Sequence, residues 1–496
     1  MSLAIVHTRA QHGVEAPPVS VEVHLSNGLP SLAIVGLPET AVKESKDRVR
    51  SAILNSHLEF PARRITVNLA PADLPKEGGR YDLPIAIGIL AASGQIPAER
   101  LNRLEFIGEL ALSGALRPVT GALPAALACA GAGRTLVLGT DNGPEAAITG
   151  AELRTADNLL RVCAALHNRE RLPRPQPAAG DGQRHHPELS DVRGQQQAKR
   201  ALEVAASGGH NLLMFGPPGT GKTMLASRLP GILPPIETRD ALDVAAIYSV
   251  IGEDCTGHWR QRPFRAPHHT ASAPALVGGG TYPRPGEISL AHGGVLFLDE
   301  LPEFQRQVLE VLREPLESGE VRIARARAQT RYPARFQLIA AMNPCPCGYF
   351  GSGDNRCRCT SEQIQRYRNR ISGPLLDRID LQVPVTAVAP TELHKAPPGE
   401  PSETVQRRVV AARATALQRQ GKPNCELNPA EIDTHCSLGQ EQTHYLEQAV
   451  TKLGLSTRAY HRVLKVARTL ADMEAVADIQ KAHLAEALSF RALDRP

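Results

Sequence analysis

The segment LLMFGPPGTGKT, residues 212–223, decides how the rest of the chain is interpreted. Residues 216–223 fit the pattern G-x-x-x-x-G-K-T, a short apolar strand precedes them, and helix-forming residues follow. A chance glycine-rich turn would lack this order of strand, loop and helix. Lys222 is expected to contact the outer phosphates of a nucleotide, and the Thr223 hydroxyl to bind Mg²⁺. The backbone N–H groups of the loop are expected to surround the phosphates, so the predicted nucleotide site comprises Gly216, Pro217, Pro218, Gly219, Thr220, Gly221, Lys222 and Thr223.

A second motif, VLFLDE at residues 295–300, complements the first. Its four apolar residues predict a strand that is buried on both faces, as in a parallel sheet. Asp299 follows the strand and is expected to hold Mg²⁺, and Glu300 is expected to polarise the attacking water. Strands that end in acidic residues are common, so this prediction depends on the pairing with the phosphate loop.

The chain of 496 residues is long enough for about three domains. Two stretches rich in proline, glycine and polar residues, 171–188 and 387–402, are typical of linkers. They separate an amino-terminal domain (1–170), a central domain (189–386) and a carboxy-terminal segment (403–496).

Hydrophobic periodicity predicts different structures in the outer parts of the chain. Alternation at period two predicts strands in the amino-terminal domain, beside an amphipathic helix at Thr40–Asn55. These strands are Ser20–Leu25, Leu32–Val35 and Ile65–Leu69. Helical periodicity predicts a small carboxy-terminal bundle formed by Glu441–Leu453, Thr457–Ala471 and Ile479–Leu488.

Composition favours a soluble cytoplasmic protein. Nine cysteines spread over a long chain do not make a disulfide framework. No apolar run approaches the ~18 residues that span a bilayer, and Pro84–Ser93 is better interpreted as a buried helix. Residues 1–6 lack the basic start of a secretion signal. The net charge of +5 permits an anionic partner without requiring one.

Together these motifs resemble AAA+ ATPases of the magnesium-chelatase-like branch, and most closely the ComM competence-protein (YifB/ComM-like) family. The likeness covers nearly the whole chain. It implies a multidomain α/β protein whose central P-loop AAA+ αβα domain carries a helical lid.

The same resemblance implies roles for four further residues. Val192 lies in the segment Leu189–Gln195, which is similar to the family segment that covers the adenine. Asn343 follows an apolar strand and resembles sensor 1, and Arg458 resembles sensor 2, although Arg462, Lys465 and Arg468 share its helix. Arg378 resembles an arginine finger; the alternative is a surface salt bridge with Asp377 or Asp380. A finger that acts on the neighbour's site implies a ring, and the family implies a hexamer.

The amino-terminal segment 75–84 resembles the active-site segment of Lon-type proteases, which implies a Lon-protease/ribosomal-S5-like α+β domain. Those proteases use a serine nucleophile activated by a lysine. Arg80 stands at the serine position here. Proteolysis is therefore disfavoured, and a docking or DNA-binding scaffold is the expected use.

A basic segment between the two central strands is the candidate DNA contact. Residues 320–332 begin with strand alternation and shift phase near Ala324, which predicts a hairpin tip there. Related ring motors insert a hairpin at this position into the pore, where arginines would track phosphates without reading sequence. The alternative is a solvated basic edge strand. The arginines concerned are Arg322, Arg325, Arg327 and Arg331.

Two other groups could bind metal. Cys345, Cys347, Cys357 and Cys359 form two C-x-C pairs that could close a tetrahedral Zn²⁺ site or remain free thiols. His268 and His269 lie in a loop rich in glycine and proline, where hydrogen bonding within the loop is favoured over metal binding.

The leading hypothesis is a hexameric, ATP- and Mg²⁺-dependent DNA motor. The family resemblance implies branch migration of DNA joints during natural transformation, with single-stranded or branched DNA as partner and contact with recombination machinery. The first alternative is a magnesium-chelatase-like ATPase that remodels a protein partner. Two further alternatives are an ATP-dependent protease and a nucleotide-gated scaffold. Arg80 disfavours the protease, and the presence of both Glu300 and Arg378 disfavours the scaffold.

Overall fold

The computed structural model describes residues 3–177, 186–257, 259–280, 283–325, 328–351, 356–387 and 397–494. The chain divides into two compact units, each with its own sheet and hydrophobic core. The first comprises Met1–Gly182, Thr238–Trp259 and Ala324–Tyr332, and the second comprises Gln183–Glu237, Arg260–Ile323 and Pro333–Pro496. Among the described residues, no helix combines the length and apolar character needed to cross a bilayer.

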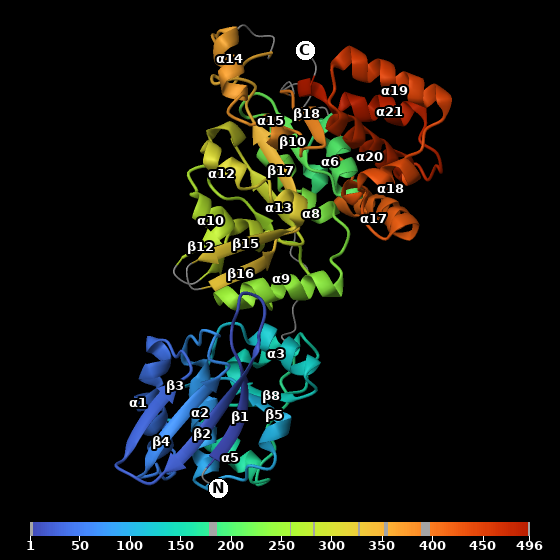
Figure 1. The fold of residues 1–496 in the computed structure, drawn as a ribbon. Coiled ribbons are helices and arrows are strands. Elements are labelled where there is room, and N and C mark those ends of the chain that lie inside the picture. Colours follow the sequence, from blue (N-terminus) through green and yellow to red (C-terminus); the bar gives the residue numbers. More distant parts are fainter. Residues whose placement is uncertain are drawn as a thin grey trace. The chain divides into compact units, whose positions relative to one another are not determined.

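The first unit is built on a seven-stranded mixed sheet with the order β3-β4-β2-β1-β5-β8-β9 (Figure 1). β2 pairs antiparallel with β1 and β4, and the other neighbours are parallel. The three strands predicted from alternation are confirmed as β2, β3 and β4. The strands are β1 (Leu3–Arg9), β2 (Pro18–Ser26), β3 (Ser31–Val35), β4 (Arg64–Ala70), β5 (Leu104–Phe106), β8 (Thr135–Gly139) and β9 (Leu153–Ala156), beside the short pair β6 (Glu109–Leu110) and β7 (Leu116–Arg117).

One helix of this unit is buried along its whole length. α2 (Asp82–Ala92) packs against β1 and β2, and every one of its residues is buried. A Cβ added at Gly88 would approach Val23 Cγ2 to 2.5 Å, so the helix lies directly on the strand. The predicted buried helix is therefore confirmed, as is α1 (Thr40–Asn55). The other helices of the unit are α3 (Ala122–Gly131), α4 (Gly143–Ala147), α5 (Leu159–Leu166) and α9 (Thr238–Ile251).

Arg80, at the position of the expected nucleophile, is buried in this unit and only 4% exposed. Its guanidinium donates to Gln11 Oε1 at 2.6 Å and to the Thr120 carbonyl. Lys76 is also buried and donates to the Pro71 carbonyl. Both cations are thus held by carbonyl oxygens, and the Lon-type fold of the domain stays a prediction.

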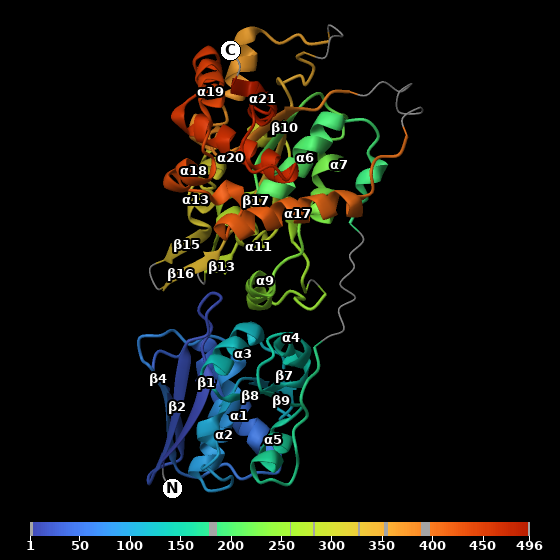
Figure 2. The same ribbon diagram turned by 90° about the vertical axis from the view of Figure 1, so that its right-hand side faces the viewer.

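The second unit contains a five-stranded sheet in which all neighbours are parallel (Figure 2). Its order is β11-β14-β17-β10-β18. β14 and β17 are buried at every residue, as expected for strands covered on both faces. Because the strands are parallel, the loops that follow them lie at one edge of the sheet. The strands are β10 (Leu212–Phe215), β11 (Phe264–Arg265), β14 (Val295–Leu298), β17 (Gln337–Met342) and β18 (Leu381–Pro384).

Of the carboxy-terminal helices, drawn in orange and red in Figures 1 and 2, α17 and α20 pack against α6 (Gln196–Gly208), and the others pack on α20 or α21. The three predicted helices are confirmed as α19, α20 and α21, within one or two residues at each end. Their use as a lid stays a prediction. These helices are α17 (Ser402–Gln420), α18 (Pro429–His435), α19 (Gln440–Leu453), α20 (Thr457–Met473) and α21 (Lys481–Ser489). The remaining helices of the unit are α7 (Lys222–Ala226), α8 (Leu229–Ile232), α10 (Ala273–Val277), α11 (Glu287–Leu290), α12 (Arg306–Glu310), α13 (Pro315–Ser318), α14 (Ser361–Arg368) and α15 (Gly373–Leu376).

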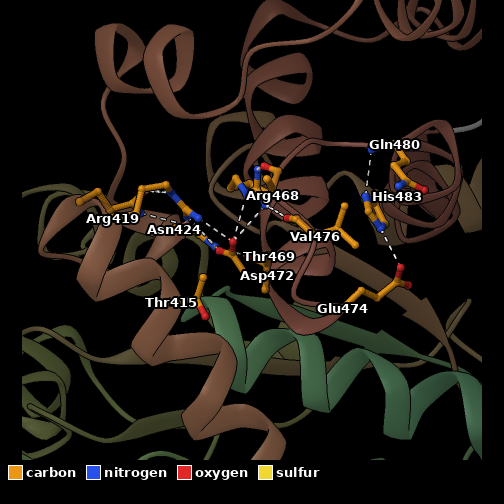
Figure 3. Close-up of polar contacts among 12 residues, drawn as sticks. Thr415, Arg419, Asn424, Arg468, Thr469, Asp472, Glu474, Val476, Gln480 and His483 are labelled. Carbon is orange, nitrogen blue, oxygen red and sulfur yellow. Dashed lines mark hydrogen bonds and ion pairs between the residues drawn. The ribbon is translucent and has the colours of Figure 1, made fainter.

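A buried carboxylate ties these helices together. Figure 3 shows Arg419 and Arg468 converging on Asp472, whose side chain is 1% exposed. Arg419 donates to both oxygens of Asp472 at 2.6 and 2.9 Å, and Asn424 donates at 2.8 Å. Asn424 also bonds Thr469, which in turn bonds His210 just before β10. The carboxy-terminal helices are therefore linked by polar contacts to the base of the parallel sheet.

The basic segment forms a two-stranded hairpin, β15 (Glu320–Arg325) with β16 (Ala328–Pro333). Val321 and Ile323 are buried and Arg322 is exposed, so the alternation is confirmed. The predicted hairpin is confirmed: β15 ends at Arg325, one residue past Ala324, and β16 begins at Ala328. Strand pairing extends past the point where the side-chain pattern changes phase.

Candidate nucleotide site

The phosphate loop lies between β10 and α7, at the edge where the parallel strands end. Gly216 packs so closely on β18 that an added Cβ would lie 2.0 Å from the Val385 carbonyl oxygen. Gly219 and Gly221 have φ angles of +77° and +89°, which side chains rarely adopt. Glycine is therefore required at these positions by contact or by backbone conformation.

Lys222 lies inside the loop with 8% of its surface exposed. Its ammonium donates to the carbonyl oxygens of Gly216 at 2.7 Å and Pro217 at 2.9 Å. It also reaches Asn343 Oδ1, after β17, at 3.3 Å. Burial lowers the pKa of Lys222, while the nearby carboxylates of Asp299 and Glu300 oppose the shift. The ammonium of Lys222 thus lies inside the phosphate loop, where the phosphates of a nucleotide are expected.

Thr223 and Asp299 meet in the way a Mg²⁺ site requires. The Thr223 hydroxyl donates to Asp299 Oδ2 at 2.7 Å, and Asp299 Oδ1 accepts from the Glu300 N–H at 2.9 Å. A hydroxyl and a carboxylate side by side next to a phosphate loop are the oxygen ligands that Mg²⁺ uses. The residues present therefore fit the metal that the motif implies.

Glu300 has a contact that the sequence did not reveal. Its backbone φ is +53°, and its Oε2 lies 3.3 Å from Nδ1 of His269. The His268 ring stacks on that of His269, with centroids 4.1 Å apart, and bonds the Thr270 hydroxyl at 2.8 Å. His268 thus fits the expected bonding within the loop, whereas His269 contacts the candidate catalytic carboxylate. The two adjacent histidines marked this loop in the sequence, but nothing in the sequence pattern indicated that His269 would contact Glu300.

Val192, expected beside the adenine, is buried in the hydrophobic core of the second unit. Its carbonyl accepts from Lys199. Gln195, three positions on, connects this segment to the loop, since its amide donates to Thr386 O at 2.6 Å and Thr220 O at 3.3 Å.

The two arginines expected on the phosphates have other partners in this chain. Arg378 is 8% exposed and donates to the Pro374 carbonyl at 2.6 Å and to the carboxylate of Glu317. Arg458 is exposed, 3.7 Å from Asp377. Within the described parts of the chain, neither forms a hydrogen bond or ion pair with residues 216–223. Both roles stay predictions, and the partner of Arg378 is neither of the aspartates considered from the sequence.

The four cysteines of the two C-x-C pairs come together after β17. One ligand atom from each of Cys345, Cys347, Cys357 and Cys359 lies within 4.8 Å of the others. Among the described residues this is the one group of at least three potential metal ligands.

The candidate DNA arginines are described only in part. Arg322 is exposed and bonds Glu320 at 2.7 Å, and Arg331 is exposed. Arg327 and the side chain of Arg325 lie outside the described residues. The prediction of DNA contact stays open for all of them.

Comparison with known proteins identifies relatives along the whole chain. Family models described as "Magnesium chelatase, subunit ChlI", "Subunit ChlI of Mg-chelatase" and "Magnesium chelatase, subunit ChlI C-terminal" match residues 188–393, 21–142 and 399–491. "Uncharacterized protein YifB" of Escherichia coli is 56% identical over 498 residues, covering 100% of this chain and 98% of that protein.

Two further relatives define the range of similarity. "Competence protein ComM" of Haemophilus influenzae is 53% identical over 503 residues, which cover 100% of this chain and 98% of that protein. The "Magnesium-chelatase 38 kDa subunit" of Cereibacter sphaeroides is 28% identical over 178 residues, which cover 32% of this chain and 52% of that protein. The phosphate loop, the parallel sheet and the full-length matches agree: the chain belongs to the ComM/YifB family of magnesium-chelatase-like AAA+ proteins.

Proposed function

We propose that this protein is an ATP-driven motor that works as a hexameric ring on DNA and aids recombination of incoming strands during natural transformation. The observation that carries the proposal is the set of contacts around the phosphate loop: Thr223 with Asp299, and Lys222 with Asn343. The full-length relative named as a competence protein supports the biological setting.

The proposed chemistry is hydrolysis of ATP at the edge of the parallel sheet. Bound Mg²⁺ would neutralise phosphate charge. Lys222 and the loop N–H groups bind and orient the phosphates, and Thr223 with Asp299 holds the metal. Glu300 orients the attacking water, and Asn343 contacts the outer phosphate. Arg378 of a neighbouring subunit stabilises the charge that develops as the phosphoryl group leaves.

The proposed division of labour follows the domain boundaries expected from the sequence. Residues 189–386 form the ATPase core and 403–496 the lid that carries Arg458. Residues 1–170 form a non-proteolytic Lon-like scaffold; the burial of Arg80 supports the absence of proteolysis. ATP and Mg²⁺ are the proposed cofactors.

The test is steady-state ATP hydrolysis with and without single-stranded and branched DNA, with Lys222→Ala as the blank. We expect DNA to stimulate hydrolysis and the stimulation to disappear in Arg325→Ala/Arg327→Ala. Arg407→Ala is the matched control, because this arginine is 71% exposed on α17, outside the hairpin. A rate of ATP hydrolysis that is the same with and without every DNA at low salt, where phosphate contacts are strongest, would contradict the proposal of a DNA motor.

A magnesium-chelatase-like ATPase that remodels a protein partner is the second candidate. The observation in its favour is that magnesium-chelatase family models match all three parts of the chain. This candidate predicts intact ATP hydrolysis that responds to a protein and not to DNA, so the same assay separates the two.

A further inference from the structure

We propose that Cys345, Cys347, Cys357 and Cys359 bind one structural Zn²⁺, and that this metal positions Asn343 in the nucleotide site. The first half is independent of the function proposed above. The second half rests on that function, because it assigns the metal a part in ATP hydrolysis.

Three of the four sulfur atoms lie close to the spacing of a zinc tetrahedron, and the fourth, of Cys359, lies within 4.8 Å of each of them. Zn–S bonds of ~2.3 Å place the four sulfurs about 3.8 Å apart. The Sγ atom of Cys357 lies 3.8 Å from that of Cys345 and 3.7 Å from that of Cys347, and the Cys345–Cys347 distance is 3.3 Å. The side chains therefore converge on one centre without being joined as disulfides.

Backbone donors surround the sulfurs as they do in thiolate metal sites. The Phe350 N–H donates to Cys345 Sγ at 3.3 Å. Cys347 accepts from the backbone N–H groups of Tyr349 and Arg358. Hydrogen bonds of this kind stabilise the thiolate form and fix its direction. Gly348 follows the first C-x-C pair with a φ of +85°, which lets the chain turn back toward the second pair.

The described residues of the loop bury little apolar surface that could hold it in place. Tyr349 is half-buried and carries Arg356 over its ring at 4.3 Å, and Phe350 is 44% exposed. Partial burial of two aromatic side chains stabilises a loop far less than closure by a metal, because metal binding contributes folding free energy directly. A zinc ion would therefore decide whether this loop keeps its conformation.

The loop connects the nucleotide site to α14. Cys345 is two residues after Asn343, and a Cβ added at Gly348 would lie 2.8 Å from Pro218 Cδ in the phosphate loop. On the other side, Cys359 leads directly into the capping box of α14, formed by Thr360 and Gln363. The chain thus leaves the sensor residue and enters α14 through the cysteine cluster.

Tyr367 of α14 contacts Asn343, the candidate sensor residue. Burial raises the pKa of Tyr367 to about 12, while the backbone N–H of Asn343, which donates to its phenol oxygen, opposes the rise. Closing the loop with a metal therefore holds Tyr367 against the backbone of the residue whose side chain meets Lys222. This is the physical route from the metal to the nucleotide.

The first measurement is the metal content of the full-length protein purified without chelators. We expect one zinc per chain, lost in Cys347→Ser and Cys357→Ser but kept in Cys359→His, which retains a zinc ligand. Cys425→Ser, outside the cluster, is the matched control and should keep its metal. A wild-type protein without zinc, or with zinc that survives both serine variants, overturns the first half.

The second measurement is amide hydrogen exchange of the wild-type protein with and without a zinc chelator. We expect the Asn343 N–H to lose protection on chelation while strand β10 stays protected. Unchanged protection at Asn343 overturns the second half even if zinc is present. This readout needs no ATP turnover, so a failure of the proposed function would not be mistaken for a failure of the metal site.

Kinetics then report the consequence for hydrolysis. Metal loss should lower kcat roughly 10- to 100-fold, because one preorganised polar group is misplaced, with the Kd for ATP changed less than about threefold. A rise in Kd with kcat unchanged would mean that the loop supports nucleotide binding and not the sensor.

Discussion

At the scale of single residues, the site combines features that a pattern specifies with one that it does not. Lys222, Thr223 and Asp299 meet because the phosphate loop after β10 and the end of β14, on the other side of β17, lie at the same edge of the parallel sheet. The contact of Glu300 with His269 depends on a positive φ at Glu300, which redirects the side chain. Neither that angle nor a partner 31 positions away in the sequence is encoded in a local motif.

Replacing Glu300 tests its assigned role. Glu300→Gln should lower kcat by roughly 10²–10³-fold, because the amide no longer polarises water, while ATP binding is retained. Turnover and nucleotide titration of the same preparation measure the two effects. Glu303→Gln, which removes the carboxylate paired with Arg370, should leave kcat within about threefold. Equal losses in both variants would mean that the segment is only structural.

His269 gives a prediction of the opposite sign. The His269 ring contacts the Glu300 carboxylate, which the attacking water must reach in the proposed reaction. His269→Ala should therefore raise ATP hydrolysis in the absence of DNA several-fold. His268→Ala is the matched control, since that ring bonds Thr270 instead. A slower His269→Ala enzyme would mean that the histidine holds Glu300 in its working position.

At the scale of elements, the sequence predicted the strands and helices whose formation depends on local periodicity. The strands β2 to β4, the helices α1 and α2, and the order of strand, phosphate loop and helix all follow from spacing along the chain. The hairpin followed from the change of phase near Ala324, and β15 ends one residue later, at Arg325. The ion pair of Arg378 with Glu317 joins the segment after α15 to α13 across 61 positions, and the sequence offered only the neighbouring aspartates.

A buried ion network joins β18 to α20. Asp380 is 2% exposed and bonds Arg462 and His210, the latter at 3.3 Å. Asp380→Asn removes the buried charge of the pair, leaves the partly buried Arg462 without its charge partner, and should reduce the free energy of unfolding by ~3–5 kcal/mol. Asp377→Asn makes the same chemical change at the exposed pair with Arg458 and should cost under ~1 kcal/mol. Denaturant unfolding of both variants measures the difference, and equal losses would contradict the argument.

The same network has a defined pH dependence. Burial alone would raise the pKa of Asp380, but Arg462 and His210 overcome it and hold the pKa below its ordinary value of 3.8. A depressed carboxyl pKa stabilises the fold above the unfolded value and loses that contribution as pH falls. Wild-type protein should therefore lose stability faster than Asp380→Asn between about pH 5 and pH 3. Parallel curves for the two proteins would contradict an ionised Asp380.

At the scale of the whole molecule, the proposed role of Arg378 as an arginine finger would require more than one chain. Arg378→Ala and Lys222→Ala should each hydrolyse ATP poorly alone. An equimolar mixture should recover activity, because about a quarter of random interfaces join an intact loop to an intact finger. Turnover of the mixture is the measurement. A mixture no faster than its components would mean that Arg378 acts within its own chain or only stabilises α13.

The contacts of Lys222 carry a consequence for how a nucleotide enters. Its ammonium already has three oxygen partners, from Gly216, Pro217 and Asn343. An arriving phosphate does not fill a vacant donor; it competes with oxygens that are already bound. Nucleotide binding is then an exchange reaction in which the heat released by the new contacts is offset by the heat of breaking the old ones. An exchange of this kind would also release Asn343 Oδ1 from Lys222, so the end of β17 would respond to nucleotide binding.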